Sequence, residues 1–178
     1  MQSADGTYAL LMEPQWLNER ESRAWRGYQR MRAELGGHLS RQMSRDSNLT
    51  ESEFEILVVV SEAPEGRIRS RDLCQTLSWE RSRLSHQISR MESRGMVGRE
   101  SCDGDARGFD VVLTKAGLEA IEAAAPKHLV EVRRFFVDVL TDEQLNTLGD
   151  IAEAITTHLA SENLCADEDN GICGESAG

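Results

Sequence analysis

The segment from Leu73 to Gly117 constrains the fold of this chain more than any other part of its sequence. It reads as a short helix, a second helix rich in arginine and serine, and two strand-like runs joined by a polar turn. In the second helix, Leu84, Ile88 and Met91 recur at steps of four and three residues, so they lie on one helical face. The sequence therefore predicts a helix whose apolar face packs on a core while its other face stays in solvent.

The solvent side of this predicted helix is basic and polar. Arginine offers cations to phosphates and a two-pronged donor to guanine, and serine and histidine offer short hydrogen-bonding groups to base edges. A merely solvated charged face is the competing interpretation, because most runs of charge are that. The strands that follow favour the first interpretation, with double-stranded DNA as the partner. The candidate DNA-binding residues of the helix are Arg81, Ser82, Arg83, Ser85, His86, Ser89 and Arg90.

The two strand-like runs, Val97–Ser101 and Phe109–Leu113, flank a polar stretch with two glycines, as expected for the tip of a hairpin. We expect Arg107 at this tip to enter a minor groove, where narrow A·T-rich tracts concentrate negative potential. Asp105 is expected to pair with Arg107 or to fix the hairpin. The competing interpretation is a surface turn whose ion pair contributes about 0–1 kcal/mol.

The formal net charge of the 178 residues is −11, which by itself disfavours nucleic acid as a partner. The distribution matters more than the sum, because salt screens charges over about 8 Å at physiological ionic strength. The stretch from Arg67 to Arg99 contains eight arginines and three acidic residues, whereas residues 161–178 contain five acidic residues and no lysine or arginine. The sequence therefore predicts a locally positive surface on an otherwise acidic protein.

Several other classes of protein are disfavoured. No run approaches the roughly 20 apolar residues of a membrane span, and residues 1–13 lack the basic and apolar regions of a secretory signal. We therefore expect a cytoplasmic protein with reduced thiols and no membrane association. The chain has no Gly-rich phosphate loop, nucleophile elbow or His-Glu-x-x-His pattern, so no enzyme is predicted. No metal-ligand spacing is recognisable, and no cofactor is expected.

The rest of the chain is predicted to be helical, which makes the fold class mainly α with a small β-hairpin wing. Long helices are expected from Pro14 to Arg45 and from Thr114 to Leu140, and a last helix from Thr141 to Leu159. Their apolar residues recur mostly at steps of three and four, which is typical of helices that pack against other helices.

Local signals set further boundaries. Thr50 and Glu53 form a capping box for a core helix over residues 51–62, and Ser70 is expected to cap the short helix of the DNA-binding segment. The acidic end of the chain is expected to be disordered. The predicted organisation is an N-terminal dimerisation helix over 14–48, a winged helix-turn-helix domain over 49–114, C-terminal dimerisation helices over 115–160, and flexible tails over 1–13 and 161–178.

This order of elements resembles the MarR family of winged helix-turn-helix regulators. Residues 84–97, LSHQISRMESRGMV, are similar to the family's recognition helix with its closing glycine, and residues 105–108, DARG, followed by 111–117, VVLTKAG, are similar to its wing and next helix. The likeness extends over most of the chain, from Trp16 to Leu159. The opening residues 14–21, PQWLNERE, resemble a form common among actinobacterial members.

The resemblance implies a homodimer in which the first and last two helices of each subunit interlock. A two-fold dimer predicts a pseudo-palindromic operator with half-sites about 34 Å apart. It also implies a transcriptional regulator, and we expect it to act as a repressor. Ser70 and Arg71 are further candidates for DNA contact at the start of the first helix of the helix-turn-helix.

The resemblance also implies a small-molecule effector. Family members often bind small aromatic acids or related amphipathic molecules near the junction of the dimerisation and DNA-binding parts, and aromatic walls with an arginine suit a phenolic carboxylate. The competing interpretation is that the aromatic side chains belong to the core of the dimer interface. The candidate ligand-binding residues are Trp16, Trp25, Tyr28, Arg32, His38 and Arg99.

Two alternative functions stay open at this point. Cys74, Cys102, Cys165 or Cys173 could make the protein a thiol-oxidation-responsive regulator of the same fold, although cysteines without an activating cation are usually inert. The second alternative is a winged helix that binds proteins rather than DNA. Steep salt dependence of duplex binding separates DNA binding from that second alternative.

Overall fold

The computed structural model describes residues 15–101 and 108–169, with residues 162–169 as backbone alone. Its helices are α1 (Glu19–Ser47), α2 (Glu51–Glu62), α3 (Ser70–Leu77), α4 (Arg81–Ser93), α5 (Lys115–Val132) and α6 (Asp142–Asp169). The strands are β1 (Arg67–Arg69), β2 (Val97–Ser101) and β3 (Phe109–Leu113), and short 3-10 and π-helical turns occupy Pro64–Gly66 and Arg133–Val137.

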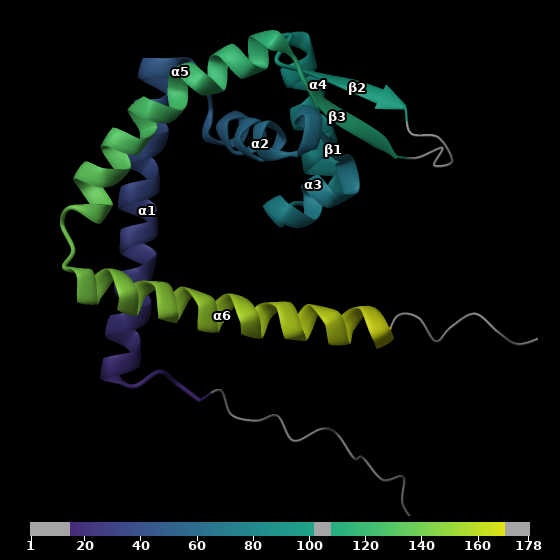
Figure 1. Cartoon of the computed structure of the whole chain (residues 1–178). Coiled ribbons are helices and arrows are strands. Elements are labelled where there is room, and N and C mark those ends of the chain that lie inside the picture. Colours follow the sequence, from purple (N-terminus) through teal and green to yellow (C-terminus); the bar gives the residue numbers. More distant parts are fainter. Residues whose placement is uncertain (1–14, 102–107, 170–178) are drawn as a thin grey trace, which may run out of the picture.

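The elements form one compact lobe and a set of long helical arms, as Figure 1 shows. The winged helix lobe consists of α2, α3, α4 and an antiparallel sheet in the order β1-β3-β2. Helices α1 and α5 lie beside this lobe, and α6 crosses α1 and continues beyond it as a separate arm (Figure 1). The predicted fold class, mainly α with a small β wing, is confirmed.

The core of the lobe fixes how α4 is rotated about its axis. Ile88 and Met91 are fully buried and Leu84 is 1% exposed, in contact with a core that includes Ile56 of α2 and Val111 of β3. Burying one side chain of this size contributes roughly 1.5–3 kcal/mol. The predicted apolar face of α4 is therefore confirmed, and its polar face must point outward.

Two glycines allow the turn after α4 to pack against the first turn of α5. Gly95 follows α4 with φ at +70°, the left-handed conformation that ends many helices. A Cβ at Gly117 would lie 2.0 Å from the carbonyl oxygen of Met96, so only glycine fits at this crossing. The Thr114 hydroxyl accepts a hydrogen bond from the Gly117 amide at 3.0 Å and caps α5.

The first long helix starts later than the sequence pattern predicts. The prediction of Pro14 as its start is wrong, because α1 begins at Glu19. Asn18 Oδ1 accepts from the Glu21 amide at 3.0 Å, and Glu21 Oε2 accepts from the Asn18 amide at 2.9 Å. This capping box satisfies amides that would otherwise lack partners, so it outweighs the apolar periodicity upstream.

Ser70 does not cap α3, contrary to the prediction. Arg69 occupies the cap position without a side-chain hydrogen bond, and Ser70 is the first helical residue. The Ser70 hydroxyl accepts instead from the Phe109 amide at 3.5 Å, on β3. The reason is that β1 pairs with β3 as far as Arg69, so the strand runs directly into the helix.

The C-terminal half departs from the prediction in two places. Helix α5 continues through Pro126 but changes to a π-helical turn at Arg133, short of the predicted end at Leu140. The capping box of Thr141 and Gln144 is confirmed, with amide-to-side-chain distances of 2.9 and 3.2 Å. Helix α6 then continues to Asp169, into the segment for which the sequence predicts disorder, because that segment still contains good helix formers.

A partly buried ion pair joins α2 to the ends of α1 and α4. Glu53 is 4% exposed, and its Oε1 lies 2.6 Å from Arg94 Nη1 at the end of α4. The second Arg94 nitrogen, Nη2, donates to the carbonyl of Asn48 at the end of α1 at 2.8 Å. Burial alone raises the pKa of Glu53, but hydrogen bonds from Thr50 and the Arg94 guanidinium outweigh it and hold the pKa below its ordinary value.

We expect Glu53→Gln to lower the free energy of unfolding at pH 7 by about 1–3 kcal/mol, since Arg94 loses a charged acceptor. A carboxylate with a depressed folded pKa stabilises the protein above its unfolded pKa and loses that effect as the pH falls. The gap between wild type and variant should therefore narrow below about pH 4.5. Urea unfolding across this pH range measures it, with the exposed Glu51→Gln as control. A gap independent of pH would contradict the assignment.

Candidate nucleic-acid interface

Helix α4 presents a basic and polar face to solvent next to the strands of the wing (Figure 1). Its apolar residues are buried in the core of the lobe, so the side chains on the opposite face of the helix point into solvent. The exposed residues are those that the sequence predicted to face outward: Arg81, Ser82, Arg83, Ser85, His86, Ser89 and Arg90.

The two arginines at the start of α4 differ in their surroundings. The Arg83 guanidinium carbon lies 3.8 Å from the ring centroid of Trp79, a cation–π contact that holds it beside the α3–α4 turn. Arg81 is the first residue of α4 and makes no ion pair with any described residue. Arg81 is therefore the more available of the two for a phosphate or a base.

The serines of α4 are partly engaged inside the protein. The Ser89 hydroxyl donates to the carbonyl of Ser85 at 3.0 Å and accepts from Arg99 Nη2 at 2.8 Å. Arg99 Nη2 also donates to the Ser85 carbonyl at 2.9 Å. The side chains of Ser82, Ser85 and His86 have no such partner among the described residues. The sequence pattern alone did not separate these two kinds of polar residue.

Helix α3 brings further polar groups to the same lobe. The Arg71 side chain is 74% exposed, and its Nε lies 3.7 Å from Asp72 Oδ1. Ser70 is half-buried beneath β3. The candidates Asp105 and Arg107 lie outside the described residues. Of the predicted DNA-binding residues, the structure thus brings those of α3 and α4 onto one lobe.

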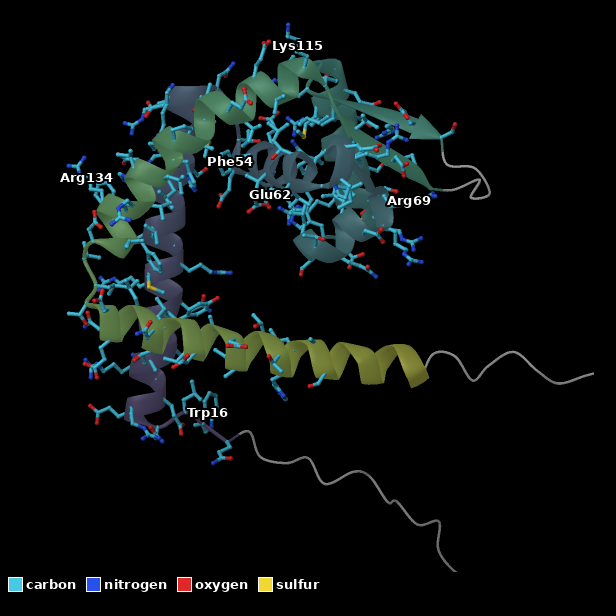
Figure 2. All side chains as sticks on the ribbon, viewed as in Figure 1. Trp16, Phe54, Glu62, Arg69, Lys115 and Arg134 are labelled. Atoms are coloured by element: carbon cyan, nitrogen blue, oxygen red, sulfur yellow. The ribbon has the colours of Figure 1, made fainter. Side chains whose placement is uncertain are left out.

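A cluster on the outer face of the sheet was not singled out from the sequence. The Arg67 guanidinium lies 2.5 Å from the Glu100 carboxylate and 3.4 Å from the Asp110 carboxylate. The Arg69 guanidinium also lies 3.4 Å from the Asp110 carboxylate. Figure 2 shows Arg69 at the edge of the lobe nearest the wing. Glu100 and Asp110 together raise the pKa of Arg67, Glu100 contributing most. The alternation of arginine and apolar residues in 67–69 was the signal for this cluster.

Residues 47–108 match the model of the MarR family. Over a longer span, the chain is 39% identical to AbsC, a MarR family transcriptional regulator from Streptomyces coelicolor. The two structures superpose with a TM-score of 0.78, and the match covers 83% of this chain and 99% of AbsC. The chain belongs to the MarR family of transcriptional regulators. Its winged helix lobe is therefore the DNA-binding fold of that family.

Two further MarR family comparisons agree with this assignment. Sco3205 from Streptomyces coelicolor, solved in complex with DNA, is 38% identical, with 82% of this chain and 92% of that one covered and a TM-score of 0.79. An uncharacterized HTH-type transcriptional regulator from Bacillus cereus is 24% identical over 126 residues, which cover 71% of this chain and 82% of that protein.

The structure does not gather the six candidate ligand residues of this MarR family chain into one place. Trp16 precedes α1 and is 86% exposed, while Trp25 and Tyr28 stack on each other with ring centroids 5.9 Å apart. Arg99 contacts α4, as described above. His38 lies elsewhere, with Nε2 3.0 Å from the Glu131 carboxylate. The fourth α1 candidate, Arg32, is exposed.

A cavity of about 870 Å³ opens between α1, the π-helical turn and α6. Of the candidate ligand residues only His38 lines it, with its ring 4.1 Å from that of Phe135. The wall is mostly apolar, with a few charged groups at its edge. The other lining residues are Gly27, Arg30, Met31, Glu34, Leu35, Phe136, Val139, Leu140, Glu143, Gln144, Thr147, Leu148 and Ile151.

Two features are absent from the part of the chain that the structure describes. No group of three or more histidine, cysteine or acidic side chains in 15–101 and 108–161 is placed to hold a metal ion. Within the same part of the chain, no helix is long and apolar enough to cross a membrane.

Cys74 is poorly suited to rapid oxidation in this MarR family protein. It is half-buried on α3, and burial raises the pKa of its thiol, against the opposing charge of Arg81. We expect iodoacetamide to alkylate Cys74 at pH 8 about 3–10-fold more slowly in the folded protein than in urea, because less thiolate is present. Mass spectrometry resolves this site from the other cysteines. Equal rates would instead favour the thiol-oxidation alternative.

Proposed function

We propose that this protein is a homodimeric, sequence-specific DNA-binding repressor whose α4 helices enter successive major grooves of an operator. One observation carries the proposal: the only face of α4 left outside the core is basic and rich in short hydrogen-bonding groups. A major groove is wide enough to admit a helix and displays a different donor and acceptor pattern for each base pair.

The charge distribution supports binding to an anionic partner such as DNA over binding to a neutral protein surface. The whole chain is anionic, yet the stretch that includes α3 and α4 carries a net excess of arginine. Phosphate contacts release counterions, so affinity falls steeply with salt. That Sco3205, 38% identical, was solved in complex with DNA supports the same role here.

The surroundings of the side chains suggest which residues contact bases and which contact phosphates. Arg81, Ser82, Ser85 and His86 are the candidates for base edges, since their side chains are exposed and have no partner among the described residues. Arg71 and Arg90 are candidates for phosphates. Lesser contributions are assigned to Arg83, Ser70 and Ser89, whose side chains already have partners inside the lobe. Arg107 remains the predicted minor-groove contact, and Asp105 remains the residue predicted to pair with it or to fix the hairpin.

We propose that a second copy of the chain covers the exposed apolar side chains of the long helices α1, α5 and α6. A single subunit leaves many large apolar side chains of α1, α5, the following turns and α6 in water, which marks an interface rather than a free surface. The side chains at least 40% exposed there include Trp25, Tyr28, Met31, Leu129, Val130, Val139, Ile151, Ile155 and Leu159. Two-fold symmetry then implies a pseudo-palindromic operator.

We further propose that a small aromatic or amphipathic effector releases the operator. The mostly apolar cavity between α1 and α6 is large enough for such a molecule. A ligand shifts the equilibrium only if it binds one dimer conformation better than the other. The preferred conformation would be one whose two α4 helices are wrongly spaced for the operator.

Arg81→Ala should weaken binding to an operator selected from genomic fragments by about 1–3 kcal/mol and relax the sequence preference at one position. Arg71→Ala should weaken binding to all duplexes and reduce the slope of log K against log salt by about 1. Fluorescence anisotropy over a salt series measures both. The control is Arg134→Ala, which removes the same charge on the far side of the molecule from Arg69 (Figure 2). No duplex binding at low salt would instead support a protein-interaction module.

Ile155→Lys should yield a monomer that no longer binds the operator, because a lysine at the centre of the α6 apolar face would be buried without a partner. Asp150→Lys, exposed on the opposite side of α6, is the control and should stay dimeric. Sedimentation velocity at micromolar concentration measures the assembly. A monomeric wild type, or an Ile155→Lys dimer as stable as the wild type, would contradict this interface.

A further inference from the structure

Arg99 occupies a position in the sheet where an apolar residue is expected. Side chains of a strand alternate between the two faces of its sheet. In β2, Arg99 shares its face with Val97, and its register partner on β3 is Val111. Val97 is 3% exposed and Val111 is fully buried. Arg99 therefore points toward α4 and not toward the outer face that carries Arg67.

The guanidinium of Arg99 contacts three residues along one stripe of α4. Nη2 donates to the Ser85 carbonyl at 2.9 Å and to the Ser89 hydroxyl at 2.8 Å, and Nε lies 3.1 Å from the Glu92 carboxylate. Steps of four and three residues place these partners on the same side of the helix. The same guanidinium lies 4.6 Å from the ring centroid of Phe109 on β3. One side chain thus joins the helix to both strands of the wing.

We propose that Arg99 is a positioning residue for operator binding, which fixes the wing strands at one distance and angle from α4. This inference rests on the proposed function. A helix in the major groove and a wing in the adjacent minor groove must engage together, so their relative placement decides whether both contacts form. Lysine would keep the charge but not the fork of donors that reaches several acceptors at once.

Arg99 acts in this proposal through other residues and not as a contact to DNA. Its side chain is 31% exposed, and Nε and Nη2 already have acceptors inside the lobe. The position is also distinct from Arg67 and Arg69, whose partners are the outer carboxylates Glu100 and Asp110.

The test compares Arg99→Lys and Glu92→Gln with the wild type, using the selected operator and a random duplex of equal length. We expect Arg99→Lys to lose about tenfold or more in operator affinity, comparable to one mismatched base pair, with affinity for the random duplex changed less than about twofold. Minor-groove protection from hydroxyl radicals should be lost, while guanine N7 protection in the major groove persists. Glu92→Gln should shift both measurements less, in the same direction. Arg67→Lys, on the outer face of the sheet, is the matched control.

Other results would overturn the inference. Equal loss for operator and random duplex, with the salt slope reduced by about 1, would make Arg99 a phosphate contact. A changed melting temperature with unchanged affinity and footprint would make its role purely structural. Wild-type protein that binds no duplex would refute the proposed function and this inference together, whereas normal wild-type binding with unaffected variants refutes the inference alone.

Discussion

The burial of one stripe of α4 is the constraint on which the functional surface depends. Leu84, Ile88 and Met91 lie against α2 and the inner face of the sheet. Rotating α4 by a quarter turn about its own axis would expose these side chains to water. Because this apolar contact fixes the rotation of α4, it also fixes the direction of every polar side chain on the other side. The chemistry of the exposed face is therefore a consequence of core packing.

Polar contacts then fix the position of α4 at its end and at its middle. Arg94 ties its end to Glu53 and to the last turn of α1, and Arg99 ties its middle to the wing. Both arginines use several donors at once, which the planar guanidinium allows and an ammonium does not. The lobe thus presents α3, α4 and the wing strands as one body, and Arg94 joins the end of α4 to the end of α1.

The arms are incomplete in a single chain. Figure 1 shows α6 extending past α1 with no other element along most of its length, and its Ile151, Ile155 and Leu159 are each more than half exposed. A helix with such a face is stable only when something covers it. The fold of the lobe is a property of one chain, whereas the stability of the arms depends on what they bind.

The sequence by itself determined the elements whose causes are local. The capping box of Thr50 and Glu53, the α4 stripe and the glycine after α4 each depend on residues within a few positions of one another, and each is where the pattern predicted it. The matching MarR motifs are also short and contiguous, which is why the family could be named from them.

Only the tertiary structure decided which polar side chains are available. Ser89 and Arg99 are ten residues apart and belong to different elements, so no local pattern shows that they bind each other. Ser70 lost its predicted cap role because strand pairing between Arg69 and Asp110, far apart in the chain, continues up to the helix. The aromatic residues of α1 and Arg99 are likewise separated by the fold. A side chain's role depends on which partners reach it in space, and that is set by packing between elements and not by spacing along the chain.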